Sequence, residues 1–225
     1  MLAAATNPTS DSRSSLAALC KVYWAPIYAF IRRNGYESDQ AQDLTQAFFV
    51  ALLEKNYLGD ADRERGRFRT FLLSSLKHFL ANERDKAHAL KRGGGQIIVS
   101  IDPTEAEGWY GPEAVEQQTP ESLFQRRWAL SLLERVMAKL GVEWARMGKS
   151  EYFEKLSPML EGDPAAHRYE DLGAELGTSA GALRVAVHRM RRRYRDLLRR
   201  EIAETVSTPA QIDEEIRFLL SALRV

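Results

Sequence analysis

The chain has 225 residues, of which 44% are hydrophobic and 28% are charged, and its formal net charge is +1. These values exclude a chain that is disordered throughout, and the length allows one large domain or two small ones. The single cysteine, Cys20, excludes an intramolecular disulfide. With no apolar run of membrane-spanning length and no signal peptide pattern at the start, the sequence predicts a cytoplasmic protein that does not insert into membranes.

The small net charge conceals a strong segregation of charge along the chain. Residues 62–92 contain nine Lys/Arg against four Asp/Glu, and residues 183–200 contain eight arginines against one aspartate. Between them, residues 101–121 contain six acids without a single Lys or Arg. Two basic blocks separated by an acidic segment indicate two nucleic-acid contact surfaces and a spacer that avoids nucleic acid.

Apolar residues at helical spacing predict three helices in the first part of the chain. The first runs from Ser14 to a stop at Asn34-Gly35, and Ser38 then caps the second. A polar turn follows, and the third helix begins at Arg67 and continues in basic form to Arg92.

Residues 93–120 interrupt the helical pattern with three consecutive glycines and several turn-like prolines and glycines. The apolar run at 97–101 could form a strand, but the sequence offers it nothing to pair with. We therefore expect a flexible acidic linker over 93–120. Helical spacing resumes near Pro120, over residues 122–140 and 151–160.

Residues 169–195 predict a helix-turn-helix. Tyr169, Leu172 and Leu176 mark a short helix, Gly177 permits a tight turn, and Ser179 is a helix-capping type. The next helix has an apolar stripe and, beside it, a basic flank: Leu183, Val187, Met190, Tyr194 and Leu197 in the stripe, and Arg184, His188, Arg191, Arg195 and Arg199 in the flank. An ordinary helix pair with a solvated charged face is the alternative. Because Asp196 is the only acid within residues 183–200, we favour a polyanionic partner.

Two segments carry a resemblance to a known family. SAGALRVAVHRMR (179–191) resembles region four of bacterial RNA polymerase sigma factors of the extracytoplasmic-function group. AQDLTQAFF (41–49) resembles the region-two helix that docks the polymerase clamp, and residues 68–92 resemble the helices that open and read the minus-ten element. The chain departs from the family pattern at Phe71, His78, Ala180 and Ala186.

The resemblance implies an all-α fold with two small helical domains and a flexible linker. Region two would span 12–92, the linker 93–120, region four 121–202, and a C-terminal extension 203–225. It further implies an alternative sigma factor that binds the clamp helices and flap of core RNA polymerase and directs promoter recognition, DNA melting and transcription initiation. It implies no cofactor, no metal and no catalytic residue. Whether an anti-sigma factor or another regulator also binds stays open.

The resemblance also assigns roles to individual residues. Those implied to bind core polymerase are Asp43, Leu44, Gln46 and Phe49. Those implied to contact the minus-ten region are Arg67, Phe71, Lys77, His78, Asn82, Arg84 and Lys86. Those implied to contact DNA from the recognition helix are Ser179, Arg184, His188, Arg191 and Arg195. Asp43 and Gln46 share a helix face, and solvation or helix capping is their alternative role.

Two other function classes compete with this interpretation. A stand-alone helix-turn-helix regulator would leave the DLTQ helix without a purpose. An enzyme acting on nucleic acid lacks a recognisable site, because the four histidines are not at metal-ligand spacing and KRGGGQ is not a phosphate-binding loop. Finally, residues 212–223 form an apolar stripe that must be buried, either on the C-terminal module, which we favour, or on a regulatory partner.

Overall fold

The computed structural model describes residues 10–54, 67–89, 118–160 and 166–224. Over these ranges the chain forms eight α-helices and one short 3₁₀ helix, with no strand, so the predicted all-α class is confirmed there. Several predicted features lie outside the described residues: most of the linker (93–117), the candidate strand at 97–101, and the side chains of Cys20, His88 and His167. Within the same ranges, every helix lacks an apolar stretch of the length that a bilayer crossing requires.

The chain divides into two compact units. The larger unit contains the residues up to Ser131 together with Ile202–Val225, and the smaller unit contains Leu132–Glu201. The boundaries therefore fall within two long helices, α5 (Pro120–Arg146) and α8 (Ala180–Ala203). The boundary that the sequence predicts at 202/203, before a C-terminal extension, lies one residue from the second of these, whereas the boundary predicted at 120/121 lies at the start of α5.

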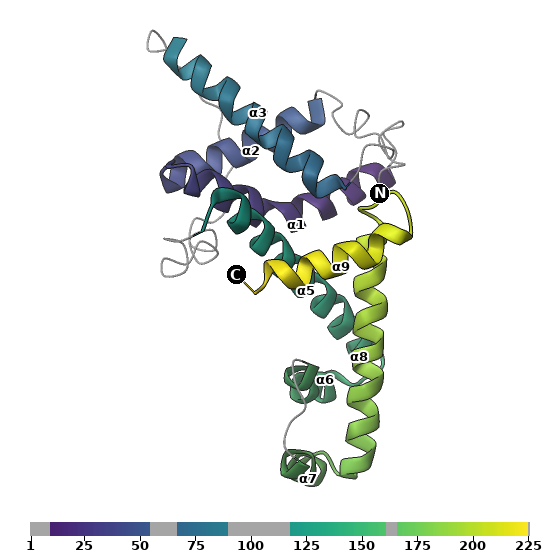
Figure 1. Cartoon of the computed structure of the whole chain (residues 1–225). Coiled ribbons are helices and arrows are strands. Elements are labelled where there is room, and N and C mark those ends of the chain that lie inside the picture. Colours follow the sequence, from purple (N-terminus) through teal and green to yellow (C-terminus); the bar gives the residue numbers. More distant parts are fainter. Residues whose placement is uncertain (1–9, 55–66, 90–117, 161–165, 225) are drawn as a thin grey trace. The chain divides into compact units, whose positions relative to one another are not determined.

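The larger unit is organised around the second half of α1 (Ser10–Arg33). Every residue from Val22 to Ile31 is buried, which is typical of a helix covered on all sides. Figure 1 shows α2 (Ser38–Glu54) and α3 (Phe68–Ala89) beside α1. Aromatic side chains join these helices, because the Phe48 ring of α2 lies 5.4 Å from the Phe79 ring of α3.

The turn between α1 and α2 lies at the predicted stop, Asn34-Gly35, but Ser38 is the first residue of α2 rather than its cap. Gly35 has a φ of 90°, a left-handed conformation that glycine adopts without steric cost. The Asn34 N–H donates to the carbonyls of the last turn of α1, and Ser38 begins α2. The hydroxyls of Ser38 and Tyr28 lie 3.1 Å apart, which ties the start of α2 to α1.

The first turns of α5 belong to the larger unit because their side chains contact α1 and α3. The Phe124 ring packs edge-on against the Phe30 ring at 6.4 Å. The Arg33 guanidinium donates to the Gln118 carbonyl at 2.8 Å, and Lys77 forms an ion pair with Glu121 at 2.7 Å. Because of these contacts between residues far apart in sequence, the boundary between the two units lies within α5 and not before it.

The C-terminal helix α9 (Ala210–Ala222) also belongs to the larger unit. The sequence favours burial of its apolar stripe on the C-terminal module, predicted as 121–202; the part of that span that α9 contacts is the first half of α5, which belongs to the larger unit. Leu219 and Ala222 are buried, and the Phe218 ring lies 6.3 Å from the Trp128 ring of α5. Just before α9, the Thr205 carbonyl accepts a hydrogen bond from the first N–H of α3, that of Phe68, at 3.2 Å.

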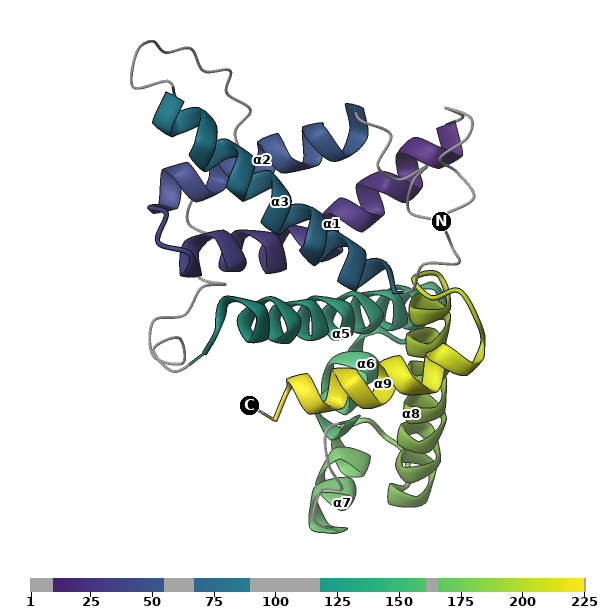
Figure 2. The same ribbon diagram turned by 45° about the horizontal axis from the view of Figure 1, so that its top comes forward.

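The smaller unit combines the rest of α5 with α6 (Ser150–Leu156), η4 (Ser157–Leu160), α7 (Ala166–Glu175) and most of α8. Its core consists of apolar side chains that are nearly fully buried: Leu132, Val136, Leu140, Leu156, Met159, Tyr169, Leu183, Val187 and Met190. In Figure 2, α7 lies beside the end of α8 at which that helix begins.

Candidate nucleic-acid and protein interfaces

The connection between α7 and α8 is a tight, internally bonded turn. Gly177 has a φ of 61°, and the Ser179 hydroxyl accepts the Ala182 N–H at 3.2 Å, so the predicted glycine turn and serine cap are both confirmed. Gly173 was not singled out from the sequence. A Cβ at Gly173 would lie 2.7 Å from the Thr178 carbonyl oxygen, so only glycine lets α7 approach the turn this closely. A glycine inside an otherwise helical pattern was the available signal.

The apolar stripe of α8 docks this helix on the smaller unit as predicted. Leu183, Val187 and Met190 are each at most 1% exposed, and Leu197 is buried as well. Tyr194 is half-buried, and its hydroxyl donates to the Leu133 carbonyl of α5 at 3.5 Å. Since this stripe faces the core, most of the flank beside it faces outward.

The predicted basic flank of α8 divides into exposed and engaged residues. Arg184, His188, Arg195 and Arg199 are exposed. The Arg184 guanidinium carbon lies 5.3 Å from the centre of the Tyr169 ring of α7, a cation–π contact. Arg191, in contrast, is half-buried and donates to the Met159 carbonyl of η4 at 2.7 Å.

An acid of α5 neutralises part of the positive charge of α8. Glu143 of α5 accepts two hydrogen bonds from Arg193, at 2.7 and 2.5 Å, and these bonds lower the pKa of the Glu143 carboxyl. Near the end of α8 the buried Glu201 accepts from two cations of α5, Arg135 at 2.7 Å and Lys139, so Glu201 does not offset the arginines of α8. The sequence prediction considered only acids within residues 183–200 and therefore missed Glu143.

The residues predicted to contact polymerase lie on α2 with different exposures. Asp43 is exposed, whereas Leu44, Gln46 and Phe49 are half-buried. Thr45, within the same DLTQ segment, is completely buried and donates its hydroxyl to the Ala41 carbonyl at 2.6 Å. Asp43 shares its exposed face with two residues at helical spacing, Ala47 and Val50, and Val50 is 50% exposed. This face therefore offers an acid and an apolar side chain together.

The residues predicted to contact the minus-ten region lie along α3 or directly before it. Five are exposed and two, Arg67 and Phe71, are half-buried. The exposed ones are Lys77, His78, Asn82, Arg84 and Lys86. Three of these cations already have a partner in the same unit. Lys77 forms an ion pair with Glu121, and Lys86 forms one with Glu83 at 2.8 Å. Arg84 donates to the Tyr36 hydroxyl at 3.1 Å. The Phe71 ring lies 6.2 Å from that of Phe68 in the core.

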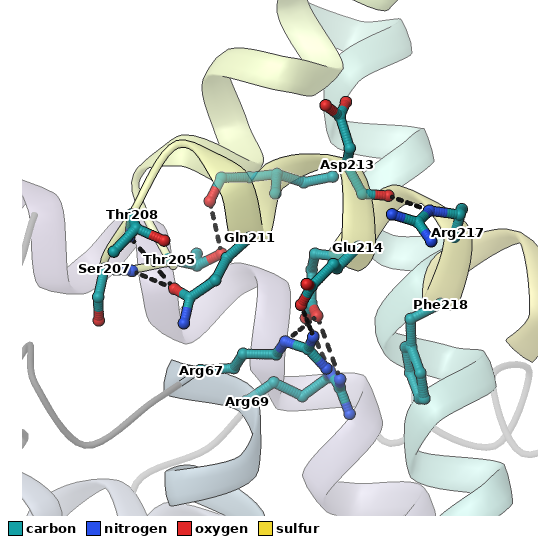
Figure 3. Close-up of polar contacts among 12 residues, drawn as sticks. Arg67, Arg69, Thr205, Ser207, Thr208, Gln211, Asp213, Glu214, Arg217 and Phe218 are labelled. Atoms are coloured by element: carbon teal, nitrogen blue, oxygen red, sulfur yellow. Dashed lines mark hydrogen bonds and ion pairs between the residues drawn. The ribbon is translucent and has the colours of Figure 1, made fainter.

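A cluster at the start of α3 was not predicted from the sequence (Figure 3). The Arg69 guanidinium donates to both carboxylate oxygens of Glu215 on α9, at 3.0 and 3.3 Å. Arg67 donates to Glu214 at 2.7 Å and forms an ion pair with Glu215 at 3.1 Å. Acids at the start of one amphipathic helix and arginines at the start of another were visible in the sequence, but nothing local indicated that they meet.

Beside this cluster lies a buried tyrosine of α1. Tyr23 is 1% exposed, and its ring packs edge-on against the Phe68 ring at 5.4 Å. Burial raises the pKa of the Tyr23 hydroxyl far above its usual range, although the nearby Arg69 charge opposes the shift. The hydroxyl therefore stays protonated under all ordinary conditions.

A scan against protein-family models, a search of curated proteins and a search of solved structures each found no match to this chain. In the part of the chain that the structure describes, no group of three or more His, Cys, Asp or Glu side chains could hold a metal ion. The chemical character of these surfaces is therefore the basis for a functional proposal.

Proposed function

We propose that this chain is an alternative sigma factor, similar to the extracytoplasmic-function group, that recruits core RNA polymerase to promoter DNA. The observation that supports this most directly is the outward basic flank of α8. This flank is positioned by a buried stripe and begins directly after a glycine turn. A short helix, a tight turn and a capped basic helix together favour a helix-turn-helix whose second helix enters the major groove.

In this proposal the two ends of α8 have different tasks. The first turns of a recognition helix reach the base edges, so Arg184 and His188 read sequence, while Ser179 contacts the backbone. Arg195 lies farther along the same flank, where it contacts phosphates. Arg191 acts indirectly, because its bond to the Met159 carbonyl holds η4 against α8.

The larger unit supplies the other two contacts of a sigma factor. Asp43, with Gln46 beside it, and the exposed Val50 offer a mixed acidic and apolar face of α2 to the clamp helices of polymerase. Along α3, Lys77, His78 and Asn82 form an exposed polar row that contacts the minus-ten element. Residues 93–120 serve as the acidic linker between the region-two and region-four modules.

Co-purification with core RNA polymerase, followed by run-off transcription on genomic fragments, tests the proposal. We expect the purified chain to bind core enzyme and to direct initiation at specific sites. Replacing both Asp43 and Gln46 by alanine should abolish core binding while leaving helical content unchanged. Asp39→Ala is the matched control, because Asp39 is also an exposed acid of α2 and lies one turn earlier.

The contrary outcomes are distinct. If the double variant keeps full affinity for core enzyme, α2 is not the polymerase contact. If the wild-type chain binds specific DNA but never core enzyme, it is a stand-alone helix-turn-helix regulator. A metal- or nucleotide-dependent activity on nucleic acid would instead indicate an enzyme.

The DNA contact has its own measurement, a binding titration on the selected promoter. Arg184→Ala should weaken specific binding by about 1–3 kcal/mol and relax the preference at one base pair. If Arg184→Ala lowers affinity equally for promoter and scrambled DNA, Arg184 does not read sequence.

A further inference from the structure

The C-terminal helix α9 is anchored on the larger unit by a buried and an exposed ion pair, and Arg67 of the exposed pair also forms an ion pair with Glu215 at 3.1 Å. The inner pair joins Arg69 and Glu215, whose side chains are 6% and 1% exposed. The Arg69 guanidinium also lies over the Phe218 ring at 3.8 Å and over the Trp128 ring at 5.0 Å. Buried charges that lose their partner are strongly destabilising, so this pair keeps α9 docked.

The outer pair joins Arg67 and Glu214 and is open to solvent. Their side chains are 30% and 51% exposed, and the nitrogen and oxygen lie 2.7 Å apart. Exposed ion pairs contribute little to stability and are screened by salt, so Glu214 can leave Arg67 without undocking α9. The Gln211 side chain accepts the backbone N–H groups of Ser207 and Thr208, which fixes the start of α9 independently of Glu214 (Figure 3).

Carboxylates and phosphates compete for the same guanidinium. Arginine donates two parallel hydrogen bonds to either group with similar geometry, so one Arg67 side chain cannot hold Glu214 and a phosphate in full at the same time. Arg67 stands directly before α3, the helix whose exposed row carries the proposed minus-ten contacts. A strand that reaches this row therefore meets an arginine already occupied by an acid of the same chain.

We propose that α9 is a built-in competitor of nucleic acid: Glu214 occupies Arg67, and a backbone phosphate of single-stranded DNA displaces it while the Arg69–Glu215 pair holds α9 in place. This inference rests on the proposed function, because it assumes that the larger unit contacts DNA. It assigns the C-terminal segment a regulatory task at the DNA surface of the larger unit. It also predicts that the acid at position 214 sets the affinity there.

The test measures binding of a labelled single-stranded oligodeoxynucleotide to the full-length chain over a range of salt concentrations. The variants are Glu214→Gln, Arg67→Ala and the two combined. Glu204→Gln is the matched control, because Glu204 is an exposed acid of the same unit that undergoes the same change of charge. Hydrogen exchange over residues 210–222 verifies that α9 stays docked in each variant.

We expect Glu214→Gln to raise affinity by about two- to five-fold, the range that corresponds to the loss of an exposed ion pair. The Arg67 Nη2 that Glu214 occupied should then contact one more phosphate, while the Arg67 Nε stays paired with Glu215, and the salt slope should become steeper by up to about 0.7 for a single strand. Glu204→Gln should change neither quantity beyond the general effect of charge. In the Arg67→Ala background, Glu214→Gln should have no effect.

The wild type, the two single variants and the double variant form a double-mutant cycle. Any DNA binding by the basic flank of α8 is the same in all four proteins, so it cancels when their affinities are compared. If Glu214→Gln and Glu204→Gln act equally, or if the effect of Glu214→Gln persists without Arg67, the competition is overturned while DNA binding by the chain stands. If single-stranded DNA binds none of the proteins, both the competition and the proposed minus-ten role of the larger unit are overturned.

Discussion

The two basic regions of this chain differ in what opposes their charge. At the start of α3, Arg67 and Arg69 pair with carboxylates of α9; Arg69 is buried and Arg67 is partly exposed. On α8, Arg184 and Arg195 are exposed on a flank that faces away from the core. A group of arginines in a sequence therefore does not determine how much positive charge a surface presents, because acids distant in sequence can neutralise it.

The same contrast recurs within α8. Arg193 is paired with Glu143, and Arg191 is bonded to a backbone carbonyl, whereas Arg184 stacks over Tyr169 with its charge still exposed. Part of the arginine cluster therefore holds the fold together and part remains available for a partner. Four sets of substitutions test this contrast.

Arg69→Ala should have the largest effect, because it removes the buried partner of Glu215 at the start of α3. Glu215 would stay buried with only Arg67 nearby, and two aromatic rings would lose their cation. We expect the free energy of unfolding of the larger unit to fall by about 3–5 kcal/mol. Urea unfolding followed by circular dichroism measures the loss, and hydrogen exchange assigns it to the larger unit. Arg217→Ala, at an exposed position of α9, should change stability by less than about 0.5 kcal/mol. Equal effects of the two substitutions would show that the buried pair is not what anchors α9.

Gly173→Ala should disturb the turn that positions the exposed basic flank of α8. Its Cβ would press against the Thr178 carbonyl oxygen and the Ala180 nitrogen, both backbone atoms that cannot rotate away. We expect the smaller unit to lose about 1–3 kcal/mol of stability and to bind DNA more weakly, as the start of α8 shifts. Gly181→Ala is the control, because its nearest contact would be the Ser179 hydroxyl at 4.0 Å, and it should be neutral or stabilising by up to about 1 kcal/mol. A fully tolerated Gly173→Ala would mean that the turn is not tightly constrained.

Tyr23→Phe should show how completely the side chain of Tyr23, beside Arg69, is shielded from solvent. Below pH 10 the tyrosine is protonated in both the folded and the unfolded chain, so its ionisation has no effect on stability. Above that pH the unfolded chain releases the proton, while burial keeps the folded-state pKa raised. The wild type should therefore lose about 1.4 kcal/mol of stability per pH unit relative to the phenylalanine variant. Parallel unfolding curves below and above pH 10 give this difference. An unchanged difference would show that Tyr23 is accessible to solvent.

Arg193→Ala and Arg195→Ala should have the smallest effects. The first should change stability, and the second should change DNA binding. Arg193→Ala removes a partly exposed ion pair with Glu143, so the smaller unit should lose no more than about 1 kcal/mol and DNA binding should be unchanged. Arg195→Ala should leave stability unchanged and reduce the salt slope of DNA binding by about one unit. A salt titration and a urea curve on each variant separate the two. Identical results for both would remove the distinction between paired and available arginines on α8.

Much of the local structure could be predicted from the sequence. The stop at Asn34-Gly35, the start of α2 at Ser38, the turn at Gly177 and the cap at Ser179 all follow from backbone preferences and hydrogen bonds within a few residues. The buried stripe of α8 follows from the 3.6-residue period of a helix, which sets which side chains share a face.

Which faces meet was decided only by the tertiary structure. The Arg67–Glu214 and Arg69–Glu215 contacts join residues 147 and 146 positions apart, and no local preference specifies such a pair. The amphipathic pattern of 212–223 predicts that one face of this helix is buried. It does not predict on which module, because both modules have apolar residues. Glu214 and Glu215 of α9 pair with Arg67 and Arg69, and the Arg69 guanidinium lies over the rings of Trp128 and of Phe218, the latter on α9 itself. Periodicity determines that a helix has a face to bury, whereas the charges and rings it meets determine where that face is buried.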